Sequence, residues 1–148
     1  MMQDIIKKLD GPRVALHVAF GLVPLLAGLD KFTYLLTDWS QYVAPVARAV
    51  LPVTPETFLY VAGVIEIVVG IAILTRWTVI GSYVAAVWLA LIAVNLILAG
   101  FFDIAVRDLV MAIAAVTLAR LTEVHEALQH AAEPARVAPR AIGRERAA

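Results

Sequence analysis

The stretch TPETFLYVAGVIEIVVGIAIL (54–74) decides the fold, because it joins a clear helix start to an apolar run long enough to cross a bilayer. Thr54 suits the N-cap, Pro55 suits the first helical position, and Glu56 favours the positive end of the helix dipole. Glu66 lies inside the apolar run, where a charge is costly. The stretch therefore predicts a membrane helix that carries a buried carboxylate.

Three further apolar runs lie in the chain, at 14–29, 78–99 and 104–121. The first is short for a hydrocarbon core of roughly 30 Å, and it contains Pro24, which predicts a kink. Short turns are expected at 75–77 and 100–103. Together the four runs predict an all-α, polytopic membrane protein that folds as an antiparallel four-transmembrane-helix bundle.

The composition supports a lipid environment. The 148 residues are 62% hydrophobic, and the mean hydropathy is +0.87. Soluble domains contain about 45–50% apolar residues. The formal net charge of +0 gives no electrostatic reason to bind nucleic acid. The chain has no cysteine, which excludes disulfides, thiolate nucleophiles and cysteine-bound metals, so a redox role requires a bound carrier or a partner's thiols.

These patterns divide the chain into three parts. We expect a cytoplasmic N-terminal tail at 1–12 and a four-helix transmembrane domain at 13–121. A cytoplasmic helical extension and a disordered tail follow at 122–148. The extracytoplasmic connection at 30–57 is rich in Trp and Tyr, which prefer the headgroup zone, and it is compatible with a helix that lies on the membrane surface.

The distribution of Lys and Arg predicts the orientation in the inner membrane. Nine of them fall on one side: Lys7, Lys8, Arg13, Arg76, Arg120, Arg136, Arg140, Arg144 and Arg146. Three fall on the other side: Lys31, Arg48 and Arg107. The positive-inside rule then places both termini in the cytoplasm. In an alternative interpretation residues 1–28 are a cleaved signal peptide, but the kink at Pro24 and the charged pair after the first run favour a retained helix.

Polar side chains from all four runs fall in the outer half of the predicted bundle. The candidate pocket residues are Glu66, Arg107, Asp108, Asp30, Lys31 and Asn95. A carboxylate such as Glu66 must be paired, protonated or directed into a wet cavity, and Arg107 or Lys31 can neutralise it. Two interpretations stay open, namely an ion pair that locks the helices together and the polar end of a ligand pocket.

The other polar residues carry weaker signals. Arg107 and Asp108 point about 100° apart on a helix, so one is expected to face the interior and the other the interface. Asp103 suits a cap of the last helix. Asn95 suits an interhelical hydrogen bond better than a ligand contact.

Aromatic and histidine residues add little to this pattern. Tyr83 and Trp88 fit core packing, and they can also stack on a flat ring such as a quinone head. His17 stands alone in the first run. His125 and His130 are five residues apart, which is poor spacing for a metal pair on one helical face. We therefore expect neither a metal nor a haem.

Three segments resemble the DoxX-like family of small four-helix membrane proteins: GLDKF (28–32), GVIEIVVGIAIL (63–74) and FDIAVRDLVMAIAAVTLARL (102–121). The resemblance covers roughly residues 13–121 and implies an antiparallel four-helix bundle. The resemblance implies that the family's polar positions correspond to Asp30, Lys31, Glu66, Arg107 and Asp108 in this sequence. Members are linked to thiosulfate:quinone oxidoreductase, as its DoxD-type subunit, and to other membrane oxidoreductase complexes. Relatives also act as chaperones or cargo receptors.

The first functional hypothesis is that the chain is a redox-associated accessory subunit embedded in membrane lipid. It would bind a quinone or a lipid-like ligand in an outward-facing polar pocket and dock a redox-enzyme partner, and a homo-oligomer is compatible with it. The absence of cysteine argues against thiosulfate chemistry by this chain alone; if it is catalytic, it is a quinone-linked oxidoreductase subunit. The alternative is a non-enzymatic assembly or chaperone-like protein whose buried charges are structural. A small transporter is a third class.

Overall fold

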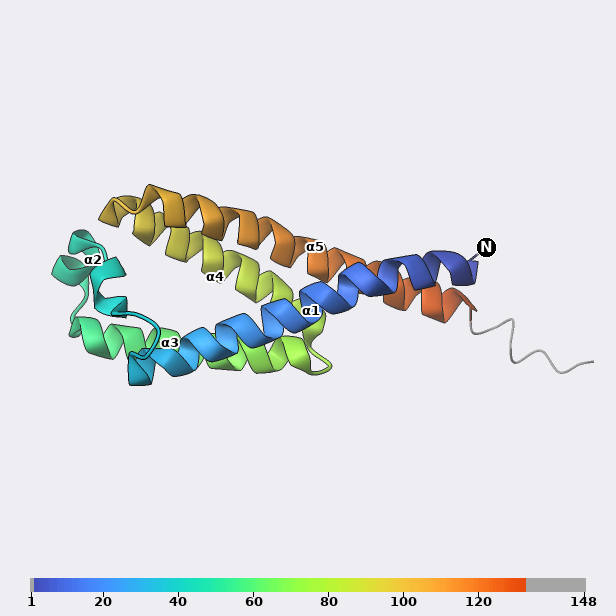
Figure 1. Ribbon diagram of the computed structural model, residues 1–148, viewed down its shortest axis with the longest axis horizontal. Coiled ribbons are helices and arrows are strands. Elements are labelled where there is room, and N and C mark those ends of the chain that lie inside the picture. Colours follow the sequence, from blue (N-terminus) through green and yellow to red (C-terminus); the bar gives the residue numbers. More distant parts are fainter. Residues whose placement is uncertain (1, 133–148) are drawn as a thin grey trace, which may run out of the picture.

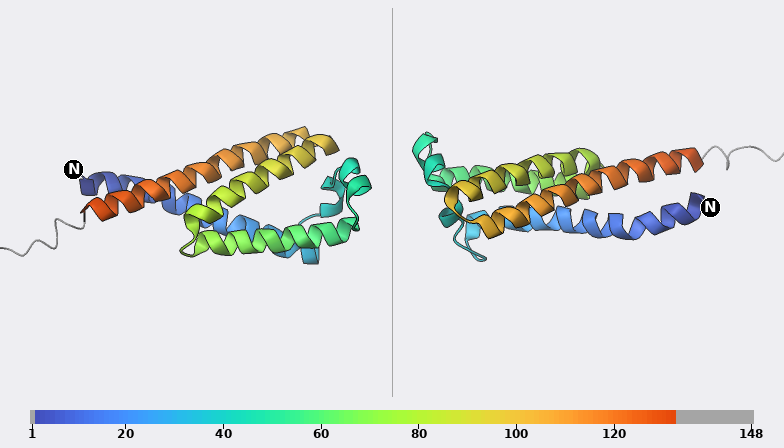
Figure 2. Two further views of the ribbon diagram at one scale, coloured as in Figure 1. Left: turned by 180° about the vertical axis from the view of Figure 1, so that it is seen from behind. Right: turned by 90° about the horizontal axis from the view of Figure 1, so that it is seen from above.

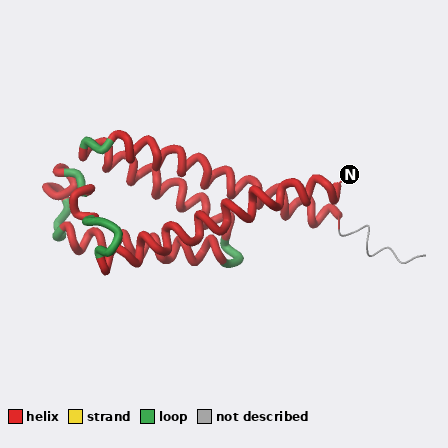
Figure 3. Tube along the Cα trace, viewed as in Figure 1, coloured by secondary structure: helices red, strands yellow, loops and turns green. Residues whose placement is uncertain are grey.

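The computed structural model describes residues 2–132, which form helices and turns with no strand in that range (Figure 1, Figure 3). Four helices are long: α1 (Met2–Thr33), α3 (Pro55–Leu74), α4 (Thr78–Ala99) and α5 (Phe102–Ala132). The short η1 (Trp39–Tyr42) and α2 (Pro45–Val50) lie in the connection between α1 and α3. The all-α fold class is confirmed, and the tail predicted to be disordered lies outside the described residues.

Three of the long helices are long and apolar enough to cross a membrane, namely Gln3–Thr33, Pro55–Leu74 and Thr78–Ala99. The fourth long helix, α5, is not among them. It carries Arg107 and Asp108 near its start and Arg120 further along, which interrupt its apolar stretch. The predicted membrane protein is therefore supported by three helices of suitable length and composition.

The long helices pack in two pairs (Figure 1, Figure 2). α1 lies along α3 and α4 lies along α5, with smaller contacts between α1 and α5 and between α3 and α4. The two pairs diverge towards the end of the molecule that contains α2, which we call the α2 end. Towards the opposite end they converge around a core that includes Ile73, Ala86 and Leu118, against which Phe20 of α1 packs.

The contact between α1 and α3 depends on glycines. A Cβ atom on Gly28 would lie 2.6 Å from the carbonyl oxygen of Gly63, and one on Gly63 would lie 2.8 Å from that of Gly28. A Cβ atom on Gly70 would lie 2.7 Å from the carbonyl oxygen of Gly21. Small residues at a seven-residue spacing allow two helix backbones to approach this closely. The close helix contact that the spacing of Gly63 and Gly70 predicts is confirmed.

The boundaries of the central helices agree with the prediction. The side chain of Thr54 accepts a hydrogen bond from the N–H of Thr57 and caps α3, which ends at Leu74. α4 ends at Ala99, and its C-cap Gly100 has a φ of 86°, the left-handed conformation that glycine adopts without strain. A tight turn at 75–77 joins the two helices, as the sequence predicts.

The first long helix is longer than predicted. The segment 1–12 was predicted to be a polar tail, but α1 begins at Met2, and it ends at Thr33, so Asp30 and Lys31 lie inside the helix. α5 runs without a break into the helical extension that the sequence predicts. Packing explains the added length of α1, because His125 of α5 is buried and its Nδ1 lies 3.6 Å from Asp10 of α1. The start of α1 and the end of α5 thus support each other.

Candidate functional site

A buried ion pair joins α1 to α3. Nζ of Lys31 lies 2.5 Å from Oε2 of Glu66, and the two side chains are only 6% and 8% exposed. Lys31 follows Gly28 by three residues, and Glu66 follows Gly63 by three, so each charged residue shares a helix face with its glycine. Sequence reasoning left Lys31 and Arg107 open as partners of Glu66, and the structure selects Lys31.

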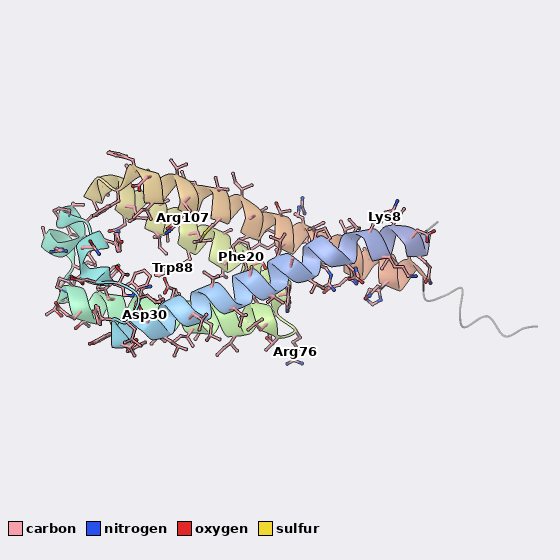
Figure 4. The ribbon with its side chains drawn as sticks, in the orientation of Figure 1. Lys8, Phe20, Asp30, Arg76, Trp88 and Arg107 are labelled. Atoms are coloured by element: carbon pink, nitrogen blue, oxygen red, sulfur yellow. The ribbon has the colours of Figure 1, made fainter. Side chains whose placement is uncertain are left out.

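Two tryptophans enclose this ion pair. Nζ of Lys31 lies 3.8 Å from the ring centroid of Trp39, which is a cation–π contact. The indole Nε1 of Trp88, on α4, donates to Oε1 of Glu66 at 3.4 Å. Figure 4 labels Trp88 between the two helix pairs. Because Trp39 comes from the connection and Trp88 from α4, the aromatic shell brings two further segments to the pair.

Arg107 and Asp108 form a second pair on α5. Nε of Arg107 donates to Oδ1 of Asp108 at 3.2 Å, and Nη2 lies 3.1 Å from the same oxygen. The Asp108 side chain is 6% exposed and that of Arg107 is 64% exposed, so the prediction that one of the two faces the interior is confirmed for Asp108. We call Lys31, Glu66, Arg107 and Asp108 the charge cluster.

Asp30 is buried near the end of α1 (Figure 4). Its carboxylate accepts hydrogen bonds from residues that follow it in the sequence. Its Oδ1 accepts the backbone N–H groups of Leu35 at 2.9 Å and Leu36 at 3.0 Å. Its Oδ2 accepts the indole N–H of Trp39 at 2.8 Å. Asp30 therefore closes the end of α1 and holds Trp39 in place over Lys31.

Asn95 fastens the connection to α4. Its Oδ1 accepts the N–H of Ala44 at 3.0 Å, and its Nδ2 donates to the carbonyl of Tyr42 at 2.7 Å. The predicted interhelical hydrogen bond forms with the short helix η1, which ends at Tyr42, and not with another long helix, because the connection folds onto α4 and offers its own backbone groups. In the same connection two hydrogen bonds from Ser40, through its hydroxyl and its N–H, lower the pKa of Asp38.

Two open apolar depressions lie on the surface along α4. The first has a volume of about 320 Å³ and is lined by Tyr83, Val84, Val87, Trp88 and Leu91, all on α4. The second has a volume of about 360 Å³ and lies among α2, the start of α3 and the last turns of α4. Leu91 lines both depressions, and Trp88, which lines the first, also hydrogen-bonds to Glu66. The two depressions thus meet on α4 at Leu91.

No protein-family model, curated protein or solved structure matches this chain. The resemblance to the DoxX-like family therefore stays a prediction from residues 13–121.

A second polar cluster holds the ends of α1 and α5 together, far from the charge cluster. Nη2 of Arg13 lies 3.1 Å from Oδ1 of Asp10, and Gln129 hydrogen-bonds to Nε2 of His125 at 2.8 Å. His17 lies 3.4 Å from the hydroxyl of Thr78, which links α1 to α4. Within residues 2–132 no group of three His, Asp or Glu side chains is placed to hold a metal ion.

Sequence reasoning missed the roles of the two tryptophans. Trp39 was interpreted only as an aromatic residue of the headgroup zone, and Trp88 was weighed between core packing and stacking on a ring. Their approach to Lys31 and Glu66 depends on how the connection and α4 fold against α1 and α3. No spacing along the chain signals that approach, because Trp88 lies 22 residues from Glu66.

Proposed function

We propose that the chain is a multi-pass, DoxX-like protein of the inner membrane. In this proposal α1, α3, α4 and α5 all cross the bilayer as an antiparallel bundle, and both termini are cytoplasmic. Three apolar helices of sufficient length support it. The packing of α5 along α4 and the burial of the Asp108 side chain, which is 6% exposed, support α5 as a fourth span.

Single-cysteine labelling will test this topology, because the parent chain has no cysteine. We expect a membrane-impermeant maleimide to label Gln41→Cys on intact spheroplasts and Arg76→Cys only after the membrane is opened. Both positions are exposed, Gln41 in η1 and Arg76 in the turn between α3 and α4. The unsubstituted protein is the control. Labelling of Arg76→Cys on intact spheroplasts would contradict the orientation.

Within that topology, the geometry best supports the binding of a quinone or a similar isoprenoid lipid by a redox-associated accessory subunit. One observation carries this proposal: the Trp88 indole lines an open apolar depression on α4 and also donates to buried Glu66. A quinone has a flat, polar head and an apolar tail. Its head can stack on Trp88, and its tail can lie along the surface of α4 towards Leu91 and the second depression. Electrons would come from a partner enzyme.

Tryptophan fluorescence tests ligand binding. We expect a decyl-chain quinone to quench the emission of the purified protein in detergent and to reach saturation. Trp88→Phe should abolish the saturable part, because it removes the ring nearest the proposed head. Trp77→Phe is the matched control, since Trp77 is 50% exposed in the turn before α4. Linear quenching alone, or saturable quenching that survives in Trp88→Phe, would refute binding at this place.

A second candidate function is a non-enzymatic assembly role in which the buried charges are structural. One observation favours it: within the described residues, every buried polar side-chain atom of Lys31, Glu66 and Asp108 has a hydrogen-bond partner. The charge cluster therefore needs no ligand to be satisfied. This candidate predicts no saturable quenching by the quinone.

A further inference from the structure

Two leucines after the end of α1 are unusually exposed. The side chains of Leu35 and Leu36 are 84% and 73% exposed. The connection around them contains several polar residues that could take the exposed positions instead. Leu29 and Phe32, in the last turns of α1, are also exposed, at 49% and 44%. The leucine pair therefore adds to the exposed apolar side chains at this end of the protein.

The backbone N–H groups of residues 34–36 donate hydrogen bonds to acceptors within the protein. The N–H groups of Leu35 and Leu36 both donate to Oδ1 of buried Asp30, and the N–H of Tyr34 donates to the Asp30 carbonyl at 2.7 Å. Tyr34 takes a φ of 54°, which turns the chain back towards Asp30. A turn that faces water can leave its N–H groups to the solvent, whereas one that enters lipid must satisfy them internally.

We infer that Leu35 and Leu36 insert into the outer-leaflet lipid at the boundary between headgroups and acyl chains. The inference rests on the proposed membrane span of α1. Lipid is favoured over a protein strand, because Asp30 already occupies the N–H groups that a pairing strand would use. The insertion fixes the depth of the α1 end. Asp30 is thus a positioning residue that couples this depth to Trp39 and Lys31.

The test uses an environment-sensitive NBD fluorophore on single cysteines of the full chain, in phosphatidylcholine and phosphatidylglycerol vesicles. For Leu36→Cys we expect a blue-shifted emission that shallow nitroxide lipids quench at least twofold more than deep ones. For Val64→Cys, in the middle of α3 and 52% exposed, we expect the reverse. For Gln41→Cys, in the same connection, we expect the emission of water and little quenching.

Each outcome has one meaning. If Val64→Cys is quenched and Leu36→Cys emits as in water, the leucine inference is wrong and the membrane proposal stands. If neither is quenched, the membrane proposal itself is wrong.

Asp30→Ala tests the role of the carboxylate. It leaves the N–H groups of Leu35 and Leu36 without their acceptor, so we expect the NBD emission at position 36 to shift to that of water. The signal of Val64→Cys in the same background should stay unchanged, which shows that the protein is still inserted. An unchanged signal at position 36 would overturn the role given to Asp30.

Discussion

Glu66→Ala is expected to lower the free energy of unfolding by roughly 3–5 kcal/mol, the usual cost of removing one partner of a buried ion pair. The substitution leaves the Lys31 ammonium without its nearest counter-charge, and the Lys31 side chain is only 6% exposed. Trp88 also loses its acceptor. Unfolding in mixed detergent micelles, followed by circular dichroism, measures the change.

A double-mutant cycle isolates the ion pair from other effects. We expect Lys31→Met and Glu66→Met to be strongly destabilising one at a time, and the double variant to recover most of the loss. The exposed pair of Arg120 and Glu123 is the matched control, and Glu123→Ala should cost at most about 1 kcal/mol. Additive losses at Lys31 and Glu66 would show that the pair does not hold α1 to α3.

Gly63→Ala is expected to destabilise the protein by about 1–3 kcal/mol, as overpacking does, although alanine is the better helix former. The new Cβ would lie 2.8 Å from the carbonyl oxygen of Gly28, and this backbone atom cannot move without displacing α1. The same displacement lengthens the contact between Lys31 and Glu66. The coupling energy of that pair should therefore fall in the Gly63→Ala background.

Gly11→Ala is the matched control for this experiment. A Cβ on Gly11 meets nothing within 4 Å, so the substitution should be neutral or should stabilise α1 by roughly 0.5–1 kcal/mol through helix propensity. If Gly63→Ala behaves like Gly11→Ala, the close contact of the two backbones is not required for the fold. If it destabilises but leaves the coupling intact, the glycines and the ion pair act separately.

Local signals in the sequence determined much of the helical framework. Thr54 and Pro55 mark the start of α3, and Gly100 marks the end of α4, because capping and backbone conformation depend on a few neighbouring residues. The apolar runs predicted helices of membrane length, because the length and composition of a run are also local properties of the sequence. The predicted start of α1 was wrong, since its first turns are held by contacts with α5, about a hundred residues further along the chain.

The sequence also marked Glu66 as a residue that needs a partner, because an isolated charge in an apolar helix is costly wherever the helix lies. It could not choose between Lys31 and Arg107. That choice depends on which backbone comes closest to α3, and the contact of Gly28 with Gly63 brings α1 there. Only the tertiary structure decides such a partner, because an ion pair is set by the distance between two helices rather than by spacing along either one.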